Sequence, residues 1–124
     1  MKKILAYANA GGGVGMGHLY RLTCLVDKYF FGHHVDFLVR NEYQESFYLQ
    51  TNLNFTLDSN LDEKEEYIIF LDTKESVKGF ITEFPNSKFI VIDNVTKSAL
   101  GCDYRIYPSY YFNEDNLLKY NIPI

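Results

Sequence analysis

A glycine-rich segment near the N-terminus constrains the fold of this chain more than any other feature. Five of the eight glycines lie at residues 11–17, between an apolar run and an amphipathic one. Glycine allows positive φ and close approach of the backbone, so a glycine cluster between a strand and a helix is typical of a loop that approaches a ligand. We therefore expect residues 11–17 to join the first strand to the first helix beside a binding site.

Short apolar runs alternate along the chain with amphipathic segments of three- and four-residue spacing, which predict strands and helices in alternation. This alternation predicts a single α/β domain with a doubly wound, mostly parallel, Rossmann-like sheet and right-handed crossovers. The domain is expected to span residues 1–107, with 108–124 as an aromatic tail or linker. The expected strands are residues 3–8, 34–40, 54–57, 67–71, 89–92 and 102–107, and the expected helices are 18–31, 42–50 and 77–84.

Length and composition restrict the class of protein. A chain of 124 residues, 47% hydrophobic, is the size of one ordinary domain. Its net charge of −4 gives no electrostatic footprint for nucleic acid, which is not expected as a partner. No apolar run approaches the roughly 20 residues that span a bilayer, and we expect a soluble, cytoplasmic protein. Cys24 and Cys102 form no CxxC pair and are expected to be packed and reduced, while the adjacent His33 and His34 are expected at the surface, without a metal.

Two familiar glycine loops are excluded by the residues at fixed offsets. A phosphate-binding P-loop requires a lysine after its last glycine, and His18 occupies that place here. A dinucleotide-binding loop requires GxGxxG and an acid that ends the second strand, whereas Gly13, Gly15 and Gly17 alternate and that strand ends at Arg40. The sequence therefore predicts no nicotinamide or flavin cofactor.

The residues that follow the loop have the chemistry of a catalytic site. His18 and Arg21 are three residues apart and share a helix face, and a histidine in the first helical turn favours the neutral imidazole that a general base requires. Ligands of doubly wound sheets bind beyond the carboxyl ends of the strands, where two acids follow apolar runs. The candidate site combines the catalytic base His18 with the substrate-binding residues Gly13, Gly15, Gly17, Arg21, Asp72 and Asp93.

A structural interpretation of the same residues is also open. A histidine in the first turn of a helix is often a cap or a satisfied packing residue. An acid that follows a buried strand often caps the next helix, and this role is available to Asp72 and Asp93.

The motif Gly-x-Gly-His-x-x-Arg, directly after an N-terminal strand, resembles the opening of three related groups of proteins. These are the nucleotide-sugar hydrolases of pseudaminic acid synthesis, spore-coat polysaccharide proteins, and glycosyltransferases of the two-domain B-type (GT-B) architecture. The motif lies at residues 15–21, and the resemblance continues through Leu71-Asp72, Ile92-Asp93 and Cys102-Asp103-Tyr104.

The resemblance implies the N-terminal domain of an enzyme of surface polysaccharide biosynthesis. His18 would be the base that activates water, or an acceptor hydroxyl, with UDP as the leaving group from a UDP-sugar. A second α/β domain would hold most of the nucleotide. Lys74 stands where the hydrolases carry a tyrosine that lines the site, so the resemblance leaves the sugar unspecified.

Two functions from different classes are therefore expected. The first is hydrolysis or transfer of a nucleotide sugar, and the alternative is a non-catalytic module that binds a sugar phosphate or another anion, or a protein. Aromatic residues near the C-terminus predict an interface with a second α/β domain or with another copy, unless their rings pack over the sheet edge. They are Tyr104, Tyr107, Tyr110, Tyr111, Phe112 and Tyr120.

Overall fold

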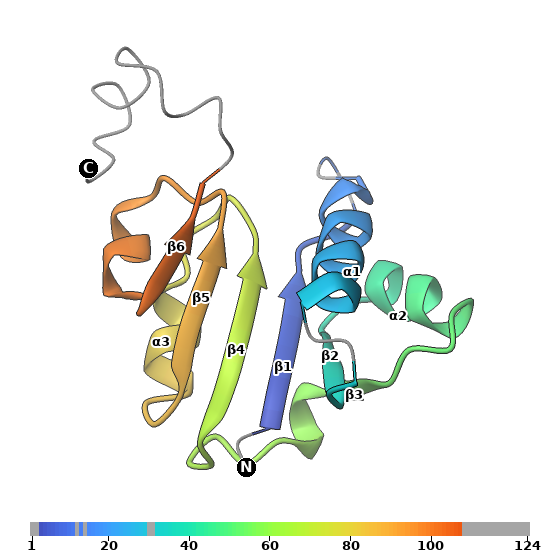
Figure 1. Ribbon diagram of the computed structural model, residues 1–124, viewed down its shortest axis with the longest axis horizontal. Helices are drawn as coiled ribbons and strands as arrows, with labels where there is room; N and C mark the ends of the chain where they lie inside the picture. The colour runs from blue at the N-terminus through green and yellow to red at the C-terminus, as the bar shows by residue number, and fades with distance from the viewer. Residues whose placement is uncertain (1–2, 12, 14, 30–31, 108–124) are drawn as a thin grey trace.

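The computed structural model describes residues 3–11, 13, 15–29 and 32–107, which form one sheet with helices on both faces (Figure 1). All six strands are parallel, in the order β3-β2-β1-β4-β5-β6. They are β1 (Lys3–Ala8), β2 (Val35–Val39), β3 (Phe55–Leu57), β4 (Tyr67–Asp72), β5 (Lys88–Ile92) and β6 (Tyr104–Ile106). The helices are α1 (Gly17–Tyr29), α2 (Glu42–Leu49) and α3 (Lys78–Glu83), with short 3-10 helices η1 (Asp58–Asn60) and η2 (Lys97–Gly101).

This architecture confirms the predicted doubly wound, Rossmann-like α/β fold and the central position of the first strand. Each expected strand and helix is present, with ends that differ by a few residues. Among the strands the largest difference is β6, which begins two residues later and ends one residue earlier than the expected 102–107. The aromatic tail expected at residues 108–124 lies outside the described residues.

The core lies on both faces of the sheet because side chains alternate along each strand. On β1, Ile4 and Ala6 join a cluster with the buried face of α1, which includes Leu19 and Leu22. The intervening Leu5 belongs to the opposite cluster, with the buried side chains around α3. A central strand that packs on both faces has to be apolar throughout, and this is why its sequence run is continuous.

Gln44 is a fully buried polar residue that joins three elements near the site. Its Oε1 accepts hydrogen bonds from the backbone N–H groups of Arg40, at 2.7 Å, and Asn41, at 3.1 Å. Its Nε2 donates to the carbonyl oxygen of Ala8, at 2.7 Å. Asn41 completes a capping box at the start of α2, since its side chain accepts from the Gln44 N–H. Gln44 thereby fixes α2 to the carboxyl ends of β1 and β2.

Both cysteines carry free thiols, but their surroundings differ. Cys102 is buried, as expected, and burial raises the pKa of its thiol to about 11. The expectation that Cys24 is packed is wrong, because this residue lies on an exposed part of α1. The apolar stripe of α1 follows Leu22 and Val26, and Cys24 falls between these positions on the solvent side.

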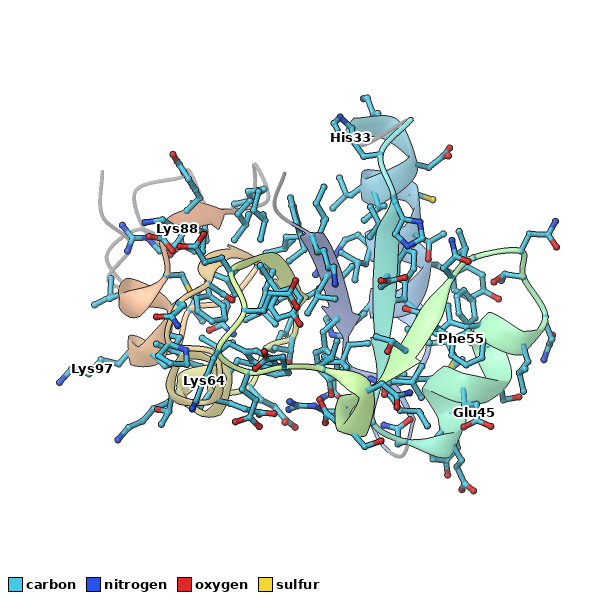
Figure 2. All side chains as sticks on the ribbon, turned by 90° about the horizontal axis from the view of Figure 1, so that it is seen from below. His33, Glu45, Phe55, Lys64, Lys88 and Lys97 are labelled. Carbon is cyan, nitrogen blue, oxygen red and sulfur yellow. The ribbon has the colours of Figure 1, made fainter. Side chains whose placement is uncertain are left out.

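Two further observations concern the helices and the adjacent histidines. None of the helices in the described ranges is long and apolar enough to cross a membrane. His33 and His34 are exposed after the end of α1, where Figure 2 labels His33. The Nε2 atom of His34 lies 3.0 Å from Oδ1 of Asp36.

Replacing Gln44 with leucine should lower the free energy of unfolding by about 2–4 kcal/mol. The change keeps the side-chain volume but leaves one carbonyl and two N–H groups without their buried partner. Chemical denaturation followed by circular dichroism measures the loss. The control is Glu45→Gln on the exposed side of α2, labelled in Figure 2, which should change stability by less than about 0.5 kcal/mol. Equal effects of the two variants would contradict the assigned role of Gln44.

The folded protein should react with a thiol reagent at Cys24 only. At pH 8 the thiolate that reacts is scarce at Cys102, because burial raises the pKa of that thiol to about 11 and also blocks access. Mass spectrometry should find one adduct under native conditions and two after unfolding in urea. Two adducts at equal rates in the folded protein would rule out a buried Cys102.

Candidate functional site

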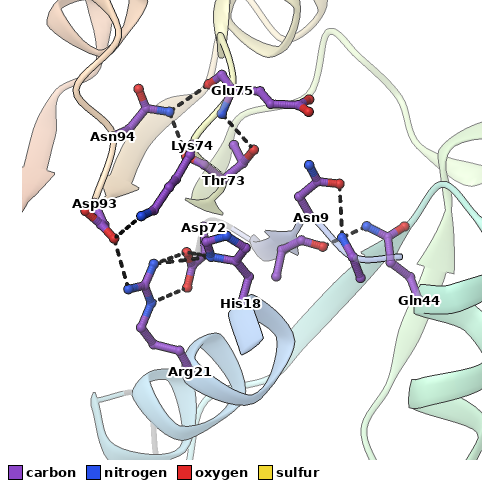
Figure 3. A network of polar contacts seen from close by, with 12 residues as sticks. Asn9, His18, Arg21, Gln44, Asp72, Thr73, Lys74, Glu75, Asp93 and Asn94 are labelled. Carbon is purple, nitrogen blue, oxygen red and sulfur yellow. Dashed lines mark hydrogen bonds and ion pairs between the residues drawn. The ribbon is translucent and has the colours of Figure 1, made fainter. Parts of the chain in front are cut away.

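The candidate site lies at the carboxyl edge of the sheet, where β1, β4 and β5 end beside the start of α1 (Figure 3). The strand order reverses here, because the chain runs from β1 outwards through β2 and β3, then returns to β4 on the other side of β1. Such a reversal is where doubly wound sheets bind ligands. An open pocket of about 710 Å³ occupies this position and is lined by Asn9, Gly17, His18, Arg21, Lys74, Glu75 and Asp93.

The buried carboxylate of Asp72 lies beneath this pocket and is the centre of its polar network. It is fully buried at the end of β4. Oδ1 lies 2.8 Å from Nδ1 of His18, and Oδ2 accepts a hydrogen bond of 2.8 Å from Nε of Arg21. Arg21 Nη2 also donates to Oδ1. Asp72 therefore holds the side chains of both His18 and Arg21 of α1.

Arg21 connects the ends of two strands. Besides its bonds to Asp72, its Nη1 donates to Oδ2 of Asp93, at 3.2 Å, at the end of β5. The hydrogen bond to Asp72 is the main cause that raises the pKa of the guanidinium above its ordinary value, although burial opposes it. Two buried carboxylates thus share one permanent cation, and each gains from it a hydrogen-bonded opposite charge of the kind that buried charges require.

The geometry favours one tautomer of His18. A carboxylate only accepts hydrogen bonds, so the imidazole donates its Nδ1–H to Asp72 and leaves the lone pair on Nε2. No hydrogen bond joins Nε2 to any residue that the structure describes. His18 also lines the pocket. The arrangement can therefore accept a proton from a group bound in the pocket.

Asp93 combines two features that are uncommon in stable cores. Its backbone has a φ of 53°, in the left-handed region that non-glycine residues rarely adopt. Its Oδ1 atom is buried without a hydrogen-bond partner among the described residues. Strained backbone and unsatisfied buried polar atoms concentrate at functional sites, where the surrounding structure holds them in place.

The loop between β4 and α3 contributes Lys74 and Glu75 to the pocket lining. Neither is among the candidate residues named from the sequence, although the resemblance aligns Lys74 with a tyrosine that lines the site. Lys74 Nζ lies 3.7 Å from Oδ2 of Asp93. Asn94 is a further residue that the sequence did not indicate. It is buried, and its Nδ2 donates to the carbonyl oxygens of Thr73 and Glu75, both at 2.7 Å. The only signal in the sequence was a second polar residue after an apolar run, which is too general to identify a site.

The glycine loop has more than one role. Gly17 begins α1 and lines the pocket. Gly13 and Gly15 precede it and are not among the described residues that line the pocket, and Gly15 has a φ of 75°. Gly11 is required for packing, because its φ is 88° and a Cβ atom there would lie 2.1 Å from the Tyr43 ring. Part of the glycine cluster is therefore explained by packing against α2.

The helix-capping alternative for the two acids is wrong. The residue before α3 is Val77, and no side chain caps that helix. Thr96 precedes η2, which also has no side-chain cap. Asp72 and Asp93 instead accept hydrogen bonds from α1 side chains.

Removing Arg21 should destabilise the fold, because Asp72 and Asp93 then lose their shared cation. For Arg21→Ala we expect a loss of about 3 kcal/mol, at the low end for a broken buried ion pair since the Arg21 side chain is 35% exposed. Arg21→Lys keeps the charge but not the planar guanidinium, so its stability should lie between those of wild type and Arg21→Ala. Thermal and chemical denaturation measure both. A loss no larger than that of Lys88→Ala, which removes a surface ion pair with Asp103, would contradict this role.

The structure brings His18, Arg21, Asp72 and Asp93 into direct contact, from three elements far apart in the sequence. Their predicted contacts with a substrate stay predictions. Comparisons of the chain with protein-family models, curated proteins and solved structures find no match.

Proposed function

We propose that this pocket binds the sugar of a nucleotide sugar, and that His18 is the general base of a hydrolase or glycosyltransferase-like reaction. The observation that carries the proposal is the 2.8 Å contact between His18 Nδ1 and the buried Asp72 carboxylate. It supports an imidazole that donates its Nδ1–H to Asp72 and presents Nε2 to an open pocket at the switch point of the sheet.

Asp72 acts on His18 in two ways. Its carboxylate fixes the ring orientation and the Nδ1–H tautomer, and it stabilises the imidazolium that forms when Nε2 takes a proton. Arg21 holds the carboxylate from the other side through two hydrogen bonds. The pair is therefore preorganised before any ligand enters.

The reaction step uses these groups as follows. Nε2 of His18 takes a proton from water, or from an acceptor hydroxyl, while that oxygen forms a bond to the anomeric carbon of the sugar. The bond from the anomeric carbon to the diphosphate breaks, and its electron pair leaves with UDP. A base in this position contributes about 10²–10⁴-fold to the rate. The remaining acceleration has to come from binding and from stabilisation of the leaving group.

A second α/β domain would bind the nucleotide. Two cations line the pocket, and Arg21 already donates to Asp72 and Asp93, which leaves the single charge of Lys74 against the charges of a diphosphate. We therefore assign the sugar side of the cleft to this domain. Free thiols at Cys24 and Cys102 favour a reducing compartment, the cytoplasm. The proposed reaction belongs to the synthesis of surface polysaccharides, as the resemblance implies.

Substitution of His18 or Asp72 should reduce the release of UDP from a UDP-sugar. His18→Ala removes the base and should lower kcat by about 10²–10⁴-fold. Asp72→Asn keeps the shape but no longer favours the required tautomer, and its loss should approach that of His18→Ala. A coupled assay for UDP measures both variants, in the chain alone and in a fusion to a nucleotide-binding α/β domain.

Two controls separate catalysis from stability. Glu45→Gln should keep wild-type turnover, and circular dichroism should show folded protein for every variant that is assayed. Full UDP release by a folded His18→Ala variant would exclude His18 as the base. Binding of a sugar phosphate without turnover, in both forms of the wild-type protein, would favour the non-catalytic binding module.

A further inference from the structure

The two cations of the pocket differ in how many of their N–H donors are already hydrogen-bonded. Two cations, Arg21 and Lys74, lie among the carboxylates of Asp72, Glu75 and Asp93. Arg21 donates to Asp72 through Nε and Nη2 and to Asp93 through Nη1. Its guanidinium therefore has few donors left for a ligand.

Lys74 is the pocket cation with donors available. Its side chain is 61% exposed, and Nζ lies 3.7 Å from Oδ2 of Asp93, beyond hydrogen-bond distance. No hydrogen bond joins Nζ to any of the described residues. An ammonium group carries three N–H donors, so an acceptor that enters the pocket can bind without displacing a protein partner.

The backbone on both sides of Lys74 is held in place. Nδ2 of the buried Asn94 donates to the carbonyl oxygens of Thr73 and Glu75, the two neighbours of Lys74 in the chain. Oδ1 of Asn94 accepts from the N–H and the hydroxyl of Thr96, at 3.0 and 2.6 Å. Figure 3 shows the resulting position, with Lys74 extended towards Asp93 and away from Asn9.

We infer that Lys74 recognises an anionic group on the ligand of this pocket, and that Asn94 is the positioning residue that holds Lys74 there. The inference deepens the proposed function, and it rests on that function for the identity of the ligand as a nucleotide sugar. Glu75 and Asp93 keep the pocket from attracting anions in general. Recognition is therefore local, and it selects a ligand whose negative group reaches Lys74.

Two sources can supply that group. One is an acidic substituent of the sugar, such as a carboxylate, and the other is the diphosphate of the nucleotide. Both are oxyanions that accept charge-assisted hydrogen bonds from an ammonium. UDP-glucuronic acid, UDP-glucose and UDP, titrated separately, distinguish them.

The test compares the folded Lys74→Ala variant with wild type by calorimetric and NMR titration. The matched control is Lys97→Ala, which removes an exposed lysine on η2, away from the pocket and labelled in Figure 2. For Lys74→Ala we expect the Kd of UDP-glucuronic acid to rise about 5–20-fold, the usual effect of losing one partly exposed charged hydrogen bond. Raised ionic strength should weaken binding to wild type more than binding to the variant.

The three probes give distinct outcomes. A rise confined to UDP-glucuronic acid assigns the anion to the sugar, and an equal rise for all three assigns it to the diphosphate. Equal Kd values for Lys74→Ala, Lys97→Ala and wild type with every probe would overturn the inference, as would the absence of binding of all three to wild type.

A third comparison separates this inference from the proposed function. Retained UDP release in His18→Ala, together with weakened binding in Lys74→Ala, would reject the catalytic assignment and keep the anion site. The opposite pattern would reject the anion site and leave the base in place. Asn94→Ala, if folded, should reproduce part of the Lys74→Ala effect on Kd without removing a charge.

Discussion

The buried carboxylate of Asp72 is the interaction on which this site depends. A fully buried charge is costly unless it is paired and hydrogen-bonded, and Asp72 meets this requirement through Arg21 and His18. Both partners come from the first two turns of α1. The same contacts that stabilise the charge therefore also fix α1 against the ends of β4 and β5, and they set the orientation of the histidine.

Two buried side-chain amides support this arrangement from the sides. Gln44 bonds to the backbone at the ends of β1 and β2, and Asn94 bonds to the loop that follows β4. Both side-chain amides are uncharged, and each bonds through its oxygen as well as its nitrogen. Neutral amides therefore hold the backbone at the carboxyl edge of the sheet, and the ionised side chains of Asp72 and Arg21 lie between them at the pocket.

Much of the fold and part of the site could be predicted from the sequence. The continuous run of β1 and the stripe at Leu19, Leu22 and Val26 required a sheet covered by a helix, and the structure has both. Acids that follow parallel strands had to lie at one edge, and Asp72 and Asp93 do. The exposure of Cys24 was missed because positions of one helix only one or two residues apart can lie on opposite faces, and Cys24 lies between the buried Leu22 and Val26. The positions of Glu75 and Asn94 at and beside the pocket were not predicted, because loop residues follow no periodicity.

The sequence by itself determined the parallel α/β class, the place of the connection between β1 and α1, and the edge of the sheet at which the candidate site lies. These follow from local periodicity and from the direction of parallel strands. The tertiary structure alone decided which groups contact one another. Arg21 bonds to carboxylates 51 and 72 residues away in the chain, and His18 orients on the first of them. Such contacts depend on how α1 packs across β4 and β5, and no local pattern encodes a pairing between elements so far apart.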